Sequence, residues 1–183
     1  MKLVPTKIAG CFIIEPKIIN DARGYFMESF NEYVFNTETG LNIHFVQDNQ
    51  SFSTKGVLRG LHYQKGIHAQ SKLVRVLSGE VLDVVVDIRP DSPTYGQYVS
   101  VLLSAENQLQ LFIPKGFAHG FLVLSDDATF FYKCDTFYNA SAEAGIKYND
   151  PEINIDWQMR LSDLIISDKD KVQPPLEQAD KIW

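Results

Sequence analysis

Two short segments concentrate polar, titratable residues within runs that otherwise have the composition of β-strands. The first spans residues 56–64 and carries His62, and Lys72 follows ten residues later. The second spans residues 114–121, where proline and glycine predict a turn that leads His119 into an apolar strand. Histidine titrates near neutral pH, so these side chains could transfer protons, bind a metal or satisfy a buried hydrogen bond.

The turn at residues 114–119 has the spacing Pro-x-Gly-x-x-His and resembles the second motif of the cupin superfamily, whose jelly-roll barrels often hold a metal. Such a site would need a second histidine two residues after His62 and a carboxylate a few residues further on. Here Gln64 occupies the first of these positions, and Lys72 stands where the carboxylate would help. An ammonium group repels a divalent cation, so we expect no metal at this site.

Short strands must position these residues, because β-type runs broken by turn residues dominate the middle of the chain. The predicted strands are residues 73–77, 81–88, 98–103, 110–113, 120–124 and 129–133. Helical signal is limited to a short helix at residues 31–36 and a turn at 162–164. Strands this short, at roughly ten-residue spacing, favour an antiparallel sandwich or barrel.

The predicted fold class is therefore all-β. We expect a cupin-type antiparallel jelly-roll barrel with a few short peripheral helices, in a single domain over residues 1–183. The barrel core should span about residues 43–138, and the more polar tail at about 150–183 should brace the site. A tail of this length seldom builds a core of its own.

Composition excludes several classes of function. Lys plus Arg is 17 and Asp plus Glu is 23, so the net charge is 17 − 23 = −6, which argues against nucleic-acid and anionic-membrane partners. The N-terminus lacks the apolar run of a signal peptide, and no stretch approaches the roughly 20 apolar residues of a membrane span. Cys11 and Cys134 are far apart and form no CxxC motif. We therefore expect free thiols and a cytoplasmic location.

Six segments taken together make the sequence recognisable. They are residues 48–53, 56–64, 72–76, 114–121, 149–151 and 167–170. In this fixed order they closely resemble the dTDP-4-dehydrorhamnose 3,5-epimerase family, over about Ile8 to Pro175. The resemblance implies a cofactor-independent epimerase of nucleotide-activated L-rhamnose biosynthesis, whose small-molecule substrate is dTDP-4-dehydro-6-deoxy-D-glucose, inverted at C3′ and C5′.

The resemblance also assigns catalytic roles that suit the residue types. Both carbons flank the C4′ ketone, so a base in contact can remove their protons. By resemblance His62 is that base and Asp170 orients it, although Asp168 stays open as the partner. Lys72 suits stabilisation of the enolate oxygen. Tyr132 occupies the matching position for an acid on the opposite face, and burial would keep it protonated.

Further positions match substrate-binding residues of the family. A diphosphate needs cations such as Arg59, and Gln47 and Asn49 would share one face of an extended segment. By resemblance Tyr138 would stack on thymine. The full expected set is Arg23, Phe26, Glu28, Gln47, Asn49, Arg59, His119, Tyr138, Glu143 and Lys169.

One detail does not fit a regular strand. Arg59 and His62 are three residues apart, so a flat strand would point them to opposite faces. Gly60 lies between them and could mark a β-bulge that re-aims one side chain. We therefore predict irregular pairing at Gly60.

Other functions remain open at this stage. One is a 3- or 5-epimerase that inverts a single centre, which the joint presence of Tyr132 and Tyr138 weakly disfavours. Others are a non-catalytic cupin that binds a sugar nucleotide and a metal-dependent cupin oxygenase. A binder would need no set of proton-handling groups such as His62, Lys72 and Tyr132. The resemblance further implies a homodimer, in which the run at residues 7–14 could form an N-terminal strand exchanged between subunits.

Overall fold

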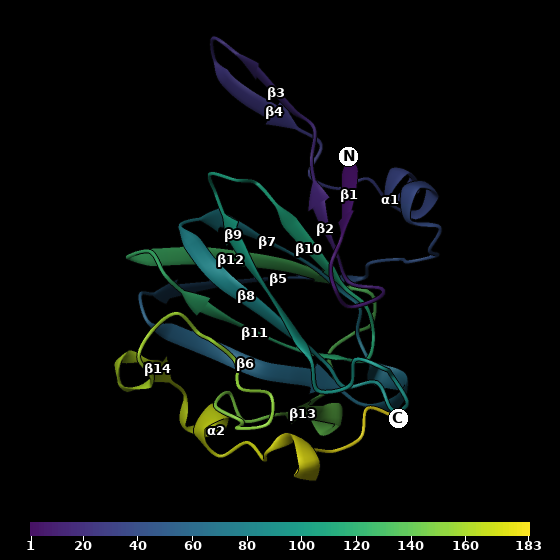
Figure 1. Cartoon of the computed structure of the whole chain (residues 1–183). Coiled ribbons are helices and arrows are strands. Elements are labelled where there is room, and N and C mark those ends of the chain that lie inside the picture. Colours follow the sequence, from purple (N-terminus) through teal and green to yellow (C-terminus); the bar gives the residue numbers. More distant parts are fainter.

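Two facing β-sheets make up most of the fold, and the computed structural model describes all residues from 1 to 183 (Figure 1). The Lys72 sheet, named for its residue on β7, has the order β1 (Lys2–Pro5), β2 (Phe12–Glu15), β10 (Gln110–Ile113), β7 (Lys72–Ser78), β12 (Asp127–Cys134) and β5 (Gln47–Thr54). The His62 sheet has the order β13 (Glu143–Gly145), β6 (Val57–Gln64), β11 (Phe117–Val123), β8 (Glu80–Asp87) and β9 (Tyr98–Ser104). All these neighbours pair antiparallel, which confirms the predicted architecture.

The smaller elements lie outside this pair of sheets. Strands β3 (Ile18–Asp21) and β4 (Gly24–Met27) form a separate hairpin, and β14 (Ile165–Ile166) pairs parallel with the start of β6. The helices are α1 (Glu32–Thr39) and α2 (Asp168–Lys171). Short 3₁₀ turns occupy Gly66–His68, Ala140–Ala142, Leu161–Asp163 and Leu176–Gln178.

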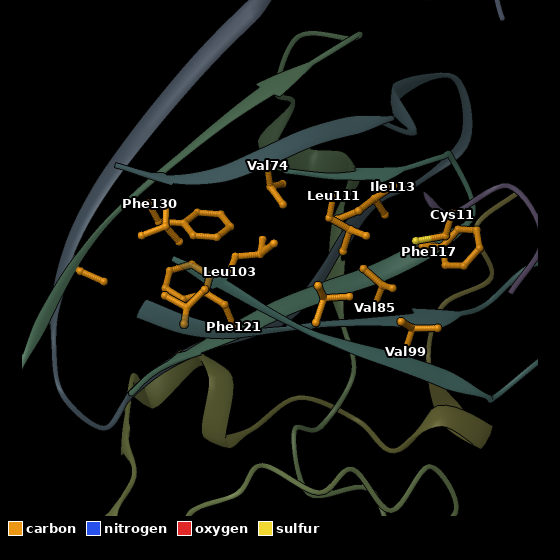
Figure 2. Packing of buried hydrophobic residues seen from close by; sticks show 14 of the residues in the cluster. Cys11, Val74, Val85, Val99, Leu103, Leu111, Ile113, Phe117, Phe121 and Phe130 are labelled. Carbon is orange, nitrogen blue, oxygen red and sulfur yellow. The ribbon is translucent and has the colours of Figure 1, made fainter. Parts of the chain in front are cut away.

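The main core lies between the two sheets, because alternate residues of each strand point inward. Figure 2 shows Val74, Leu111 and Phe130 of the Lys72 sheet facing Val85 and Phe121 of the His62 sheet. The ring centroids of Phe121 and Phe130 are 4.1 Å apart and nearly parallel, so the sheets are joined directly at this point. This stacked pair sits at the end of the core that borders the functional cavity described below.

Each sheet is covered on its outer face. Phe35 of α1 packs on Phe112 of the Lys72 sheet, and Trp157 and Leu176 of the C-terminal tail pack on the His62 sheet. Helix α1 begins at the predicted position because the Asn31 side chain accepts a hydrogen bond from the Val34 amide. The tail therefore lies against the sheet that carries His62 (Figure 1).

The predicted strands between residues 73 and 133 are all present. The largest difference is β11, which begins at Phe117 rather than Gly120. The Lys72 sheet also extends beyond the expected core range, because β2 pairs with β10 of its own chain. No helix in the structure has the length and apolar character needed to cross a membrane.

The N-terminal run at residues 7–14 differs from the predicted continuous strand. Only its last three residues lie in a strand, because residues 6–11 form a tight loop. Thr6 Oγ1 donates to the Cys11 carbonyl at 2.9 Å, and the Cys11 amide donates to the Ile8 carbonyl at 3.2 Å. Ile8 and Cys11 both enter the core through this loop, so burial rather than sheet pairing fixes the segment.

Candidate active site

A cavity of about 600 Å³ opens between the inner faces of the two sheets, and residues 165–170 of the tail form one wall. Side chains of β5, β6, β7, β11 and β12 complete its lining. The predicted site residues that line it are Asn49, Arg59, His62, Lys72, His119, Tyr132, Lys169 and Asp170. Residues that are far apart in the sequence therefore meet in one place.

His62 and Asp170 form a close pair at this cavity. The Nε2 atom of His62 is 2.6 Å from Oδ1 of Asp170, whose side chain is only 4% exposed. Because an ionised carboxylate can only accept, His62 Nε2–H is the donor, and in the neutral ring Nδ1 then keeps a lone pair. Asp168 is exposed and its Oδ1 instead accepts from Lys171 Nζ at 3.0 Å, so Asp170 is the residue that contacts His62.

Several contacts hold the Asp170 carboxylate in place. Ser167 caps the short helix α2, and the Gly60 amide lies 3.4 Å from Asp170 Oδ2. Burial raises the pKa of Asp170, but the hydrogen bonds from His62 and Gly60 and the charge of His62 outweigh it, so the pKa is lowered overall. The carboxylate is therefore ionised at neutral pH.

The predicted bulge at Gly60 is confirmed. Arg59 pairs with Phe121 and His62 pairs with His119, so three steps along β6 oppose two steps along β11. This extra residue lets Arg59 and His62 both line the cavity. Gly60 has a φ of +140° and lies against Gly120, where a built Cβ would come within 2.5 Å of the Gly120 Cα. Only glycine fits this close approach.

Lys72 and Tyr132 lie on the opposite sheet from His62. The Lys72 ammonium is 5.6 Å from the centre of the Tyr132 ring, and both side chains line the cavity. Burial raises the pKa of Tyr132, so the phenol stays protonated at neutral pH as predicted. Burial also lowers the pKa of Lys72, while the negative charges of Asp83 and Glu143 act in the opposite direction.

His119 is shielded from bulk solvent, and one side of its side chain lines the cavity. It is 7% exposed, and its Nε2 lies 2.8 Å from Oδ2 of Asp83, a residue of β8 that is fully buried. His119 therefore satisfies a buried hydrogen bond and also lines the cavity, so both readings of this residue apply.

A hydrogen-bonded rim adjoins the cavity through the lining residues Asn49 and Lys169, and it contains the predicted binding residues Gln47, Tyr138 and Glu143. Gln47 accepts from the Tyr138 amide at 2.9 Å, and its side chain donates to Asn49. The Tyr138 hydroxyl donates to Glu143, and Lys169 Nζ is 2.6 Å from the same carboxylate. The Tyr138 ring is 52% exposed, so its face is free to stack on a ligand.

The charge of the cavity is opposite to that of the whole chain. Its lining contains Arg59, Lys72 and Lys169 but a single carboxylate, that of Asp170. The chain carries a net charge of −6. Cations concentrated in a cleft attract an anionic ligand to that cleft and not to the surface in general.

Arg23, Phe26 and Glu28 do not join this site within the chain. Arg23 lies at the tip of the β3–β4 hairpin and pairs with Asp21 at 2.6 Å, whereas Phe26 and Glu28 line a second cavity of about 250 Å³. Figure 1 shows the hairpin projecting from the body, away from β6 and α2. Phe26 is 68% exposed, so the hairpin leaves a large apolar surface uncovered.

Sequence reasoning missed several lining residues. Phe121, Phe130, Ile165 and Ile166 form the apolar part of the wall, and they give no signal because apolar strand residues are usual in a core. Asp83 could have been recognised as a candidate site residue from the sequence, because it is the single carboxylate within the apolar run 81–86. The structure contains no cluster of three or more His, Cys, Asp or Glu residues that could hold a metal ion.

Known proteins resemble this chain over most of its length. A family model described as dTDP-4-dehydrorhamnose 3,5-epimerase matches residues 5–178. The dTDP-4-dehydrorhamnose 3,5-epimerase of Shigella flexneri is 56% identical over 170 residues, which cover 93% of this chain and 93% of that protein.

Solved structures match over nearly the full length. The dTDP-4-dehydrorhamnose 3,5-epimerase of Elizabethkingia anophelis has a TM-score of 0.95 at 54% identity, with 100% of this chain and 99% of that chain covered. A dTDP-6-deoxy-D-glucose-3,5-epimerase of Legionella pneumophila, in complex with dTDP-4-keto-L-rhamnose, has a TM-score of 0.94 at 51% identity, with 98% and 94% covered. These matches confirm the predicted cupin-type barrel.

Proposed function

Because the chain belongs to the dTDP-4-dehydrorhamnose 3,5-epimerase family, we propose that His62, Lys72 and Tyr132 divide the proton chemistry of that reaction among them. The chain is an isomerase of dTDP-L-rhamnose biosynthesis, and it epimerises dTDP-4-dehydro-6-deoxy-D-glucose at C3′ and C5′. The observation that carries the proposed roles is the 2.6 Å pair of His62 and Asp170, which faces Lys72 and Tyr132 across one cavity.

His62 is proposed as the base. With Nε2–H donated to Asp170, the Nδ1 lone pair is free to take a proton from a carbon next to the ketone. The ionised Asp170 then stabilises the imidazolium that forms, without itself taking the proton. A buried carboxylate can do this better than an exposed one, because water does not screen it.

Lys72 is proposed to stabilise the enolate oxygen. Removal of a proton from C3′ or C5′ places negative charge on the C4′ oxygen, which a fixed cation in a cleft can bind. Burial lowers the pKa of the Lys72 ammonium, and the negative charge that develops on the enolate would act against this effect. Lys72 thus favours the enolate more than the uncharged ketone.

Tyr132 is proposed as the acid that completes inversion. Inversion requires that the returning proton arrive on the face opposite to the base. Tyr132 lies on β12 of the Lys72 sheet, whereas His62 lies on β6 of the His62 sheet. Burial raises the pKa of Tyr132, so its proton is present at neutral pH.

The rim is proposed to bind the nucleotide half of the substrate. Arg59 and Lys169 supply cations for the diphosphate, and Lys169 is already oriented by Glu143. The exposed Tyr138 ring offers a stacking surface for thymine, while Gln47 and Asn49 present amides beside it. His119 is proposed to contact the sugar from the buried end of the cavity.

We also propose a homodimer in which the β3–β4 hairpin of one copy completes the site of the other. Arg23, Phe26 and Glu28 are expected binding residues, yet they lie on a hairpin that projects away from their own cavity. The exposed apolar side chains of Ile19, Tyr25 and Phe26 suit burial against a second copy. Sedimentation showing only a monomer at micromolar concentration would contradict this arrangement.

A cytoplasmic location is proposed on two grounds. Cys11 and Cys134 are both free and buried, which suits a reducing compartment. The family also consists of cytoplasmic enzymes that act on sugar nucleotides. A fluorescent fusion that co-fractionates with membranes would argue against this placement.

The function is tested by solvent isotope exchange. The wild-type protein should incorporate deuterium from deuterated water at both C3′ and C5′ of the substrate, whereas His62→Ala should incorporate it at neither carbon. His44→Ala is the matched control, because His44 is an exposed histidine paired with Glu32 outside the cavity. Label at a single carbon would contradict the double epimerisation, and full exchange by His62→Ala would contradict the assigned base.

A further inference from the structure

We propose that Asp83 is a positioning residue of this active site, which fixes the ring of His119 so that one ring nitrogen faces the sugar. The proposal rests on the proposed function, because it takes the cavity as the place where the sugar binds. It assigns a role in turnover to a side chain that does not itself line the cavity.

Asp83 is an unusual residue for its place in the fold. It stands within β8 between Leu82 and Val84, and it is 0% exposed. Its strand neighbours across the sheet are Phe121 and Val101, whose side chains belong to the main core. The Asp83 carboxylate thus points into the apolar space between the sheets.

The carboxylate is only half satisfied by hydrogen bonds. Oδ2 lies 2.8 Å from Nε2 of His119, whereas the buried Oδ1 has no hydrogen-bond partner. An ionic group in this position costs free energy unless it is fully paired, so an apolar residue would serve stability better. Folding alone therefore gives no reason for an aspartate here, and a role in the site does.

The contact with Asp83 determines which nitrogen of the neutral His119 ring carries the hydrogen. Because a carboxylate only accepts, the proposal directs the hydrogen on Nε2 to Asp83 and leaves Nδ1 of the neutral ring as an acceptor. The His119 ring also packs against Phe130, with centroids 5.9 Å apart and planes inclined by 26°. Ring orientation and the position of the hydrogen are therefore both determined.

This arrangement parallels that of the proposed base. His62 and His119 are direct partners across β6 and β11, and both side chains line the cavity. Each ring donates Nε2–H to a buried carboxylate, Asp170 in one case and Asp83 in the other. In each neutral ring the lone pair is therefore left on Nδ1.

The chemical partner of His119 Nδ1 follows from its acceptor character. It can bind a hydroxyl group of the sugar next to the C4′ ketone, but not the ketone oxygen itself, which is also an acceptor. Such a hydrogen bond would hold the ring of the sugar in register with His62. A displacement of the sugar by about 1 Å from its reactive position can reduce turnover by about 10²-fold.

Asp83→Asn tests the proposal because it keeps the volume and removes the charge. We expect kcat/KM to fall by about 10²-fold, since the amide no longer enforces one hydrogen position on His119. Asp87→Asn is the matched control: Asp87 is equally buried on the same strand, but it binds Arg89, Ser92 and Thr94 away from the cavity. It should lower thermal stability and leave kcat/KM within about twofold.

A double-mutant cycle separates positioning from a merely structural role. If Asp83 acts through His119, Asp83→Asn combined with His119→Asn should lose no more activity than His119→Asn alone, within about threefold. Losses that multiply, or an Asp83→Asn enzyme within about twofold of wild type, would overturn the proposal. An inactive wild type or an active His62→Ala would instead overturn the proposed function itself.

A measurement on the unmodified protein keeps the proposal testable if Asp83→Asn fails to fold. Two-dimensional ¹H–¹⁵N spectra that correlate ring nitrogens with ring protons distinguish the two neutral forms of histidine. His119, assigned by comparison with His119→Asn, should carry its hydrogen on Nε2. A hydrogen on Nδ1 in the neutral ring would contradict the assigned geometry.

Discussion

The substitution Asp170→Asn gives the sharpest test of the proposed base. Asp170 is buried, and its Oδ1 accepts from His62 at 2.6 Å. Asparagine has nearly the same shape, but its amide group can donate to His62 Nε2. The ring would then carry its hydrogen on Nδ1, the atom that should accept the substrate proton. The variant therefore keeps the packing and removes the free lone pair.

The expected magnitude follows from this loss. A positioned general base contributes about 10²–10⁴-fold to a rate, so kcat should fall by a factor in this range while KM changes by less than about threefold. The assay couples product formation to a reductase that consumes the 4-keto product. Asp168→Asn is the control, because that exposed carboxylate contacts Lys171 and not His62. Its kcat should stay within about twofold of wild type.

Stability should respond to pH with a defined sign. The pKa of Asp170 is lowered in the folded protein, so its ionised form stabilises the fold above the unfolded pKa of about 3.9. This contribution is lost as the pH falls through the folded pKa, and the stability difference between wild type and Asp170→Asn should shrink there. Full turnover by Asp170→Asn, or equal loss in Asp168→Asn, would refute the reasoning.

Further substitutions test the rest of the site. Tyr132→Phe should lower inversion by about 10²-fold while deuterium exchange persists, because the base can return the proton on its own face; equal loss of both would contradict the acid role. Lys72→Met should reduce kcat by about 10²–10³-fold, and a change confined to KM would argue against enolate stabilisation. Gly60→Ala should lower the melting temperature, because its Cβ would lie 2.5 Å from the Gly120 Cα; an unchanged melting temperature would show that the strands can separate. Hydrogen bonds from Arg89 and its neighbours hold the pKa of Asp87 at about 2 against burial, so stability should fall between about pH 4 and pH 2 in wild type but not in Asp87→Asn.

The barrel strands could be predicted because their signals are local. A window of about ten residues contains both the alternating apolar residues of a strand and the turns that bound it. The observed bounds of β7 to β12 lie close to those predicted from this pattern. The loop at residues 6–11 could not be predicted from such a local pattern. Ile8 and Cys11 look like part of a strand, but their burial depends on a core built by residues 60 or more positions later. Long-range packing determines that segment.

The site shows the same division between local and long-range signals. His62 and His119 are conspicuous as titratable residues in apolar strands, so sequence reasoning selects them. The contact between His62 and Asp170 spans more than one hundred residues, and only the resemblance singled out Asp170 over Asp168. The bulge at Gly60 was inferred from side-chain parity, because Arg59 could not otherwise share a cavity with His62. The projection of the β3–β4 hairpin had no local signal at all, since it depends on what the hairpin packs against.

The two-sheet architecture itself suits a reaction that inverts stereochemistry. A base and an acid on one strand would approach the sugar from the same side and return the proton where it was removed. Here His62 projects inward from one sheet and Tyr132 projects inward from the other. A sugar held between them would meet the proposed base on one face and the proposed acid on the other. Because C3′ and C5′ both flank C4′, one such opposed pair can serve both carbons if the sugar rebinds with the other carbon next to His62.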